Sequence, residues 1–254
     1  MASLRVKKKI NKLHGNNSSI SIVEALPNDL LVQIVGRVAS RSMADLYKVK
    51  LSCKEFLNAS EDGYVYQRAS MDNFALVPLP WFKREKEILF LRRCRERGNL
   101  EIFYREGMVQ YFKTLMLNLG LENLKKAALE GHHEAKYVYS MILMANREDE
   151  EERKLGFDLF AELKNSVASC RKRVKSFVQS MWVKNLVIVP NQGLDLCHSS
   201  SCQRNGTEKK KKKKKKYSTW YAAAYKIDDE DDCTLCKYCA GNYELGLFCN
   251  MFHV

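Results

Sequence analysis

The sequence predicts an all-α protein in which a small N-terminal helical unit precedes an array of antiparallel helical hairpins. Prolines occur only at Pro27, Pro78, Pro80 and Pro190, so residues 81–189 contain none. Because proline disrupts helix interiors, that long stretch is free to form consecutive helices. Its apolar residues recur at helical spacing. Runs that alternate at period two are short, and no Asn-Gly or Asp-Gly hairpin signal joins two of them.

Composition restricts the class of protein. The 254 residues are 46% hydrophobic and 29% charged, as in a folded soluble protein. No apolar run approaches the roughly 20 residues of a membrane span, and no apolar stretch follows Lys7–Lys9 as a secretory signal requires. We therefore expect the nucleus or the cytoplasm, where the nine cysteines should not form disulfides.

The chain divides into four parts by composition. Residues 1–22 are polar and basic and are expected to be a disordered arm. Residues 23–75 form a first apolar block, and residues 81–189 form the predicted helical array. Residues 190–254 are rich in lysine and then cysteine, and we expect this tail to be largely disordered.

Three short helices are expected in the first apolar block. Leu26–Leu31 opens the first helix, with proline in the first turn and Asp29 near the positive end of the helix dipole. Ser42 can cap a second helix, and Ser52–Glu55 has the pattern of a capping box for a third. Apolar residues at helical spacing define one face of the first helix: Leu30, Leu31, Ile34, Val35 and Val38.

This block resembles the F-box. The matching elements are Leu26-Pro27-Asn28-Asp29-Leu30-Leu31, Ile34-Val35-Gly36-Arg37-Val38 and Leu51-Ser52-Cys53-Lys54-Glu55-Phe56. Phe56 replaces the usual tryptophan, and Gly36 interrupts a helix at a cost of up to ~1 kcal/mol. The resemblance implies that the block binds a Skp-type adaptor and, through it, a cullin. The residues implied in adaptor binding are Leu26, Pro27, Leu30, Leu31, Ile34, Val35, Cys53 and Phe56.

The middle of the chain contains a repeat. Residues 94–104 and 127–137 superpose with an offset of 33 residues, which pairs Gly98 with Gly131 and Tyr104 with Tyr137. Such a period is typical of helix-turn-helix solenoids. The second copy resembles a Sel-like repeat, a relative of tetratricopeptide repeats. The residues expected to make its close interhelical contacts are Ala128, Gly131, Ala135 and Tyr137.

Two closing helices are expected after this repeat. One has its apolar spacing at Leu155, Leu159 and Leu163, and the other from Val174 to Met181. Stacked hairpins create a concave surface that can hold a peptide or a domain. The alternative is that they only support the F-box.

The cysteines of the tail allow two interpretations. Cys197, Cys202, Cys233 and Cys236 could close one tetrahedral Zn²⁺ site, with the intervening segment looped out. Otherwise the thiols belong to an unstructured tail, and no cofactor is expected. The run from Lys209 to Lys216 supplies eight of the thirteen net positive charges, and it serves as a solvated linker, a nuclear-localisation signal or a polyanion contact.

No pattern for catalysis is present in the sequence. It lacks a nucleophile with its base, a carboxylate pair in a cleft and a phosphate loop. A nucleic-acid role is disfavoured, because the lysines are not interleaved with aromatic residues. We therefore expect a non-enzymatic substrate-recognition adaptor of a Skp–cullin–F-box ubiquitin ligase that recruits a protein the sequence does not name. The alternative is a helical-repeat scaffold that acts outside a ligase.

Overall fold

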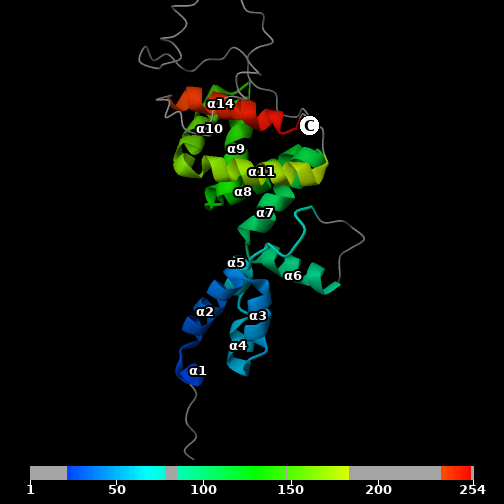
Figure 1. Cartoon of the computed structure of the whole chain (residues 1–254), viewed down its shortest axis with the longest axis vertical. Helices are drawn as coiled ribbons and strands as arrows, with labels where there is room; N and C mark the ends of the chain where they lie inside the picture. Colours follow the sequence, from blue (N-terminus) through cyan, green and yellow to red (C-terminus); the bar gives the residue numbers. More distant parts are fainter. Residues whose placement is uncertain (1–21, 78–84, 147, 183–235, 253–254) are drawn as a thin grey trace, which may run out of the picture.

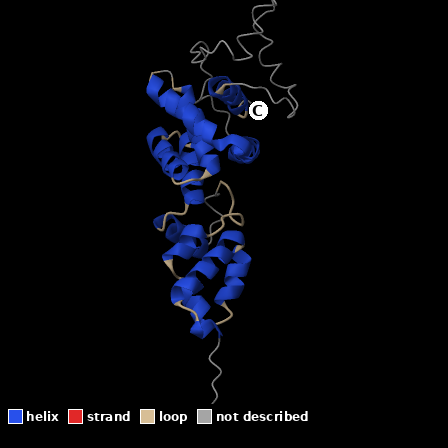
Figure 2. Cartoon of the chain, turned by 90° about the vertical axis from the view of Figure 1, so that its left-hand side faces the viewer, coloured by secondary structure: helices blue, strands red, loops and turns tan. Residues whose placement is uncertain are grey.

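A computed structural model of the chain describes residues 22–77, 85–146, 148–182 and 236–252. These residues form helices joined by short turns, and no strand occurs among them, which confirms the all-α prediction (Figure 2). The molecule is elongated, with the first helices at one end and the last helices at the other (Figure 1). No described helix has the length and apolar character that crossing a membrane requires.

The N-terminal unit contains five helices. They are α1 (Ile22–Ala25), α2 (Asn28–Arg41), α3 (Met43–Lys50), α4 (Lys54–Ala59) and α5 (Gly63–Arg68). The Ser42 hydroxyl accepts a hydrogen bond from the Asp45 N–H at 3.2 Å, which confirms the expected cap of α3.

The start of α4 differs from the prediction. The helix begins after Cys53, and the Ser52 hydroxyl donates instead to the Val49 carbonyl at 2.7 Å. The predicted Ser52–Glu55 capping box was therefore wrong. The Ser52 hydroxyl bonds to the last turn of α3 rather than to the start of α4, because a hydroxyl can donate to a carbonyl three residues earlier.

Gly36, which stood out as a weak point of α2, has a packing role. A Cβ at this position would lie 2.7 Å from the ring of Tyr64 in α5. The glycine thus lets α5 lie close against α2. The cost in helix propensity is offset by a contact between two helices that the F-box pattern alone does not reveal.

Three helical hairpins follow the N-terminal unit. The first pairs α6 (Glu85–Glu96) with α7 (Leu100–Met108), the second pairs α8 (Leu117–Leu129) with α9 (His133–Ala145), and the third pairs α10 (Glu150–Leu163) with α11 (Val167–Met181). The π-helix Val109–Lys113 continues α7, and the 3₁₀-helix Lys164–Ser166 links α10 to α11.

The turns of the three hairpins recur every 33 residues. Gly98 has φ +82°, Gly131 has φ +102° and Lys164 has φ +39°. Left-handed backbone is the usual way to end a helix, and glycine adopts it without steric cost. The repeat that the sequence showed twice therefore continues into a third hairpin, where lysine replaces glycine.

Glycines also set the closest approach between the first two hairpins. A Cβ at Gly120 would lie 2.5 Å from the backbone nitrogen of Tyr111, and one at Gly107 would lie 2.8 Å from Leu124 Cγ. Contacts this short leave no room for a side chain. Helix α7 and the π-helix that continues it can pack this closely on α8 only because both positions lack one.

We expect Gly120→Ala to destabilise the protein, because its new methyl group would meet backbone rather than a movable side chain. Overpacking of this kind costs about 1–3 kcal/mol. Chemical denaturation of the variant should show a lower free energy of unfolding. Gly131→Ala is an informative comparison, because its Cβ meets nothing within 4 Å and only its φ of +102° opposes the change.

Two hydrophobic clusters form the core. The first is built from α2–α6 and ends at Ile102, the third residue of α7. The second begins at Phe103 and runs through the hairpins to Phe252. Adjacent residues of α7 therefore belong to different clusters, and this helix joins the N-terminal unit to the array.

Part of the tail adds to the second cluster. Helix α14 (Lys237–Asn250) lies across α9 and α10, at the end of the described helices farthest from α1 in Figure 1, and buries Leu245, Phe248 and Cys249. The tail was expected to be largely disordered, but its residues 236–252 form a helix with buried side chains. These residues gain their order from the hairpins rather than from a core of their own. The predicted arm of residues 1–22 lies, apart from Ile22, outside the described residues.

Candidate partner-binding surfaces

The residues predicted to bind an adaptor fall on two sides of α2. Leu30 and Ile34 each keep 44% of their surface exposed, whereas Leu31 and Val35 keep 4% and 0% and lie in the first cluster. Residues four apart lie on the same face of a helix, which places Leu30 beside Ile34. Leu30 and Ile34 therefore face away from the core, whereas Leu31 and Val35 are part of it.

The other predicted residues are distributed around this pair. Pro27 is exposed at the N-cap of α2, and Cys53 is half-buried at the N-cap of α4. Leu26 and Phe56 are half-buried and pack against the first cluster. Phe56 therefore acts as an aromatic anchor inside the unit.

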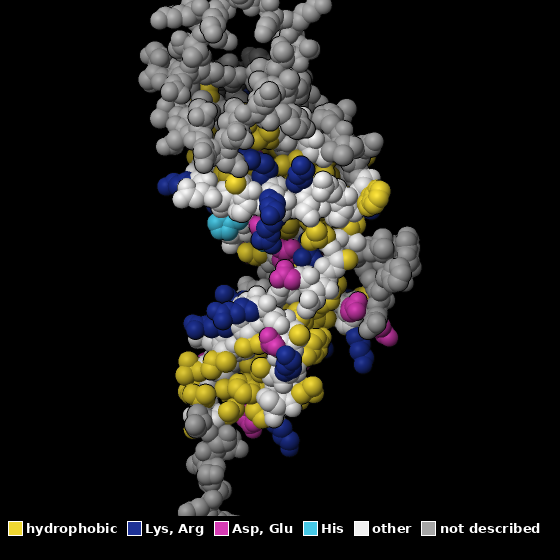
Figure 3. Space-filling view, in the orientation of Figure 1, with side chains coloured by type: hydrophobic (Ala, Val, Ile, Leu, Met, Phe, Trp, Pro, Cys, Tyr) yellow, Lys and Arg dark blue, Asp and Glu magenta, His cyan; other side chains and the backbone are white. Residues whose placement is uncertain are grey.

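Sequence reasoning missed three exposed apolar residues of α3 and α4. Tyr47 is 53% exposed, Leu57 is 45% exposed, and Leu51, at the C-cap of α3, is 87% exposed. Figure 3 shows hydrophobic side chains gathered over this end of the molecule. Exposed apolar residues that gather in this way are typical of a protein interface. Their helical spacing alone could not have distinguished them from core residues.

Polar side chains at the hairpin turns link each unit to the one before it. Asn99, at the N-cap of α7, is buried, and its amide donates to the carbonyls of Tyr66 and Ala69 at 3.1 and 2.9 Å. His132 occupies the equivalent position 33 residues later, at the N-cap of α9. Its Nε2 lies 2.9 Å from Glu101 Oε2, on α7.

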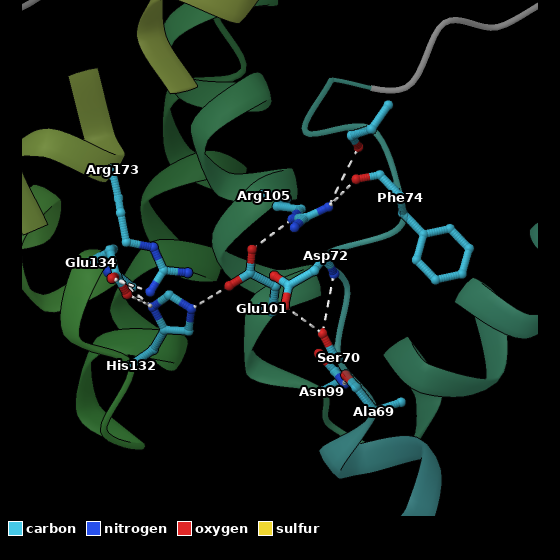
Figure 4. Close-up of polar contacts among 12 residues, drawn as sticks. Ala69, Ser70, Asp72, Phe74, Asn99, Glu101, Arg105, His132, Glu134 and Arg173 are labelled. Carbon is cyan, nitrogen blue, oxygen red and sulfur yellow. Dashed lines mark hydrogen bonds and ion pairs between the residues drawn. The ribbon is translucent and has the colours of Figure 1, made fainter. Parts of the chain in front are cut away.

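His132 is the centre of a chain of polar contacts that crosses the array (Figure 4). Its Nδ1 accepts the Ala135 N–H at 3.2 Å, so Nε2 must carry the proton that is donated to Glu101. Glu101 also pairs with Arg105 at 2.6 Å, and Glu134 pairs with Arg173 at 2.7 Å. Contacts of this kind therefore join α7 to the turn between α8 and α9, and join α9 to α11.

The far end of this chain reaches the segment that follows α5. Arg105 donates to the Phe74 carbonyl at 3.0 Å, which fixes that segment against α7. Burial opposes ionisation of Glu101, but the hydrogen bond from His132 and the charge of Arg105 outweigh it, so the pKa of Glu101 is lowered. The charged carboxylate is thus the form that holds the first two hairpins together.

The four residues predicted for repeat packing comprise three in the core and one at a turn. Ala128, Ala135 and Tyr137 are fully buried in the second cluster. Gly131 differs, because a Cβ there would touch nothing within 4 Å. Its role is the left-handed turn rather than a close interhelical contact. Leu155, expected on the inner face of α10, is 47% exposed.

Only part of the proposed zinc site can be located. Cys197, Cys202 and Cys233 lie outside the described residues, and Cys236 is half-exposed at the N-cap of α14. The structure brings no three His, Cys, Asp or Glu side chains together as a metal site within residues 22–77, 85–146, 148–182 and 236–252. Burial raises the pKa of Cys249 to about 12, so this thiol is neutral and belongs to the core.

A second candidate surface is a cavity of about 460 Å³ beside the first hairpin. It lies between α6, α7 and the segment that follows α5. Its apolar lining residues are Met71, Phe74, Ala75, Leu76, Leu91, Ile102 and Val109. Arg92, Arg95, Arg105 and Glu106 supply the charges around it.

Comparison with known proteins gives two kinds of match. A family model of plant tetratricopeptide repeats matches residues 74–179, which cover the three hairpins except for the last two residues of α11. An Arabidopsis thaliana protein named as an F-box protein, At2g35280, is 32% identical over 136 residues, covering 54% of this chain and 82% of that protein. No solved structure matches the chain.

Two longer relatives carry F-box names as well. Arabidopsis thaliana At1g67623 is 35% identical over 122 residues, covering 48% of this chain and 40% of that protein. At1g67340 is 27% identical over 139 residues, covering 54% of this chain and 36% of that protein. The chain thus spans less than half the length of these two relatives.

The positions of the helices, the 33-residue repeat and the names of the related proteins support the same family assignment. Helices α2–α4 carry the Leu-Pro, Ile-Val and Cys-Lys elements of the N-terminal block, and the matched repeat region follows them directly. The match to At2g35280 extends over most of that protein. The chain therefore belongs to the plant F-box proteins that carry tetratricopeptide-like repeats.

Proposed function

We propose that the chain is the substrate-recognition adaptor of a Skp–cullin–F-box ubiquitin ligase. In this role α2–α4 bind a Skp-type adaptor, which in turn binds a cullin, and the helical hairpins hold the protein to be ubiquitinated. The observation that carries the proposal is the exposed pair Leu30 and Ile34 on a helix whose opposite face is fully used by the core.

The exposed apolar area of α2–α4 favours burial by a partner. Leu30 and Ile34 are each 44% exposed, and exposed neighbours on α3 and α4 enlarge the same end of the molecule. Burying a leucine or isoleucine completely is worth about 1.5–3 kcal/mol. A partner that covers both residues therefore gains on the order of 2 kcal/mol from them, which corresponds to roughly 30-fold in Kd.

The proposal predicts that Leu30→Ser combined with Ile34→Ser weakens binding of a purified Skp-type adaptor by roughly 30-fold or more. Isothermal titration calorimetry would measure the Kd. Circular dichroism should show unchanged helix content, because neither side chain lies in the core. Leu31 is unsuitable for this test, since it is 4% exposed and its loss would damage the fold.

The matched control replaces two exposed leucines of the hairpins. Leu129 is 62% exposed on α8 and Leu155 is 47% exposed on α10. Serine at both positions should leave adaptor binding unchanged. Equal binding by the folded Leu30/Ile34 variant and the wild-type chain would rule out this face as the docking site.

A further inference from the structure

The cavity beside the first hairpin has the size of a ligand site. Its volume is about 460 Å³, and pockets that hold ligands in proteins are about 300–1,000 Å³. Seven apolar side chains line it, so it favours an apolar group. Neither Leu30 nor Ile34 lines it, so it is separate from the proposed adaptor surface.

The charges around the cavity are not balanced. Three arginines and one glutamate line it. Arg95 is paired with Glu106 at 2.6 Å, and Arg105 is paired with Glu101 at the same distance. Arg92 is exposed and forms no ion pair within the part of the chain that the structure describes. One guanidinium group therefore remains available beside an apolar lining.

We propose that this cavity binds a short peptide segment in which a large aliphatic or aromatic side chain stands next to an Asp or Glu. The apolar side chain fills the cavity, and the neighbouring carboxylate pairs with Arg92. Guanidinium and carboxylate groups match as two parallel hydrogen bonds, which gives the contact direction as well as charge. The inference rests on the proposed function, since it assigns this peptide to the recruited protein.

The rigidity of the walls supports the assignment. Arg105 ties the Phe74 carbonyl to α7 at 3.0 Å, and Phe74 stacks on Phe90 of α6 with ring centroids 5.7 Å apart. The segment that follows α5 is thereby fixed against both helices of the first hairpin. A pre-formed pocket binds a peptide without the cost of ordering its own walls.

The test is a selection from a phage-displayed library of random peptides against the full chain. We expect enriched peptides to share a large apolar residue with an adjacent Asp or Glu. Fluorescence anisotropy on one enriched peptide then gives Kd values for two variants. Arg92→Glu should weaken binding at least tenfold, because it reverses the unpaired charge. Ala75→Trp should abolish binding, because it fills the cavity from an exposed position.

Matched controls separate these effects from general ones. Lys172→Glu reverses an exposed charge on α11, and Ala161→Trp enlarges an exposed alanine on α10. Both should leave peptide affinity unchanged. Three results would overturn the inference. The enriched peptides could lack acidic residues, or they could bind both cavity variants as tightly as the wild type. The third result is that no peptide is enriched.

Adaptor binding of the same variants distinguishes this inference from the ligase role. Arg92→Glu and Ala75→Trp should bind the Skp-type adaptor as the wild type does. If the wild-type chain selects acidic–apolar peptides but binds no adaptor, the ligase role fails and the cavity stands. If it binds the adaptor and the peptide results are negative, the cavity fails alone.

Discussion

Glu244→Ala is expected to release α14 from the helical array. Glu244 is 2% exposed, and its carboxylate accepts two hydrogen bonds from Arg171 at 2.7 and 2.6 Å and one from the Tyr137 hydroxyl at 2.7 Å. The three residues come from α14, α11 and α9. Alanine would leave the buried tyrosine hydroxyl and the arginine without their partner.

The size of the effect follows from burial. Removing one partner of a buried ion pair costs about 3–5 kcal/mol. The side chain of Arg171 is 31% exposed and regains some water, so the lower end of that range, about 3 kcal/mol, is expected. Urea denaturation followed by circular dichroism would measure the loss in the free energy of unfolding.

The same helix offers a control. Lys237 and Asp158 form an ion pair in which the side chains are 42% and 57% exposed. Exposed pairs of this kind contribute little to stability, because water and salt screen the two charges. Lys237→Ala should therefore change stability little. Similar losses for Lys237→Ala and Glu244→Ala would show that α14 is not held by the buried carboxylate.

Ala135→Arg is expected to have a comparable or larger effect on the second hairpin. Ala135 is fully buried in the first turn of α9, and its N–H is bound to His132. Arginine there must displace neighbouring core residues, which costs about 1–3 kcal/mol, and must also bury a charge without a partner. Thermal unfolding should show a melting temperature many degrees lower or no cooperative transition.

The repeat itself supplies the control for this variant. Ala168 lies 33 residues after Ala135, in the first turn of α11, and is exposed. Ala168→Arg should therefore leave the melting temperature nearly unchanged. An Ala135→Arg protein that melts like the wild type would contradict the repeat packing.

Local patterns in the sequence predicted the features that depend on neighbouring residues. Ser42 is the cap of α3 because a serine three residues before a helical N–H can accept its hydrogen bond. Gly98 and Gly131 end helices at the predicted period because left-handed backbone favours glycine. Lys164 escaped notice because a search for repeated glycines passes over a lysine whose φ is also positive.

Features that depend on distant packing were not predictable in this way. The sequence groups Leu30 with Leu31, and only the position of the first cluster shows that one faces outward and the other inward. Helix α14 lacks the single apolar stripe of an amphipathic helix, because it is buried on more than one side. Its contact between Glu244 and Arg171 joins residues 73 positions apart.

The binding of a Skp-type adaptor tests the central claim most directly. The purified wild-type chain would be mixed with the adaptor and the N-terminal part of a cullin and separated by size-exclusion chromatography with light scattering. The account predicts one complex that contains one copy of each protein, and its loss when Leu30 and Ile34 are both serine. A folded wild-type chain that elutes alone in the presence of both proteins would contradict it.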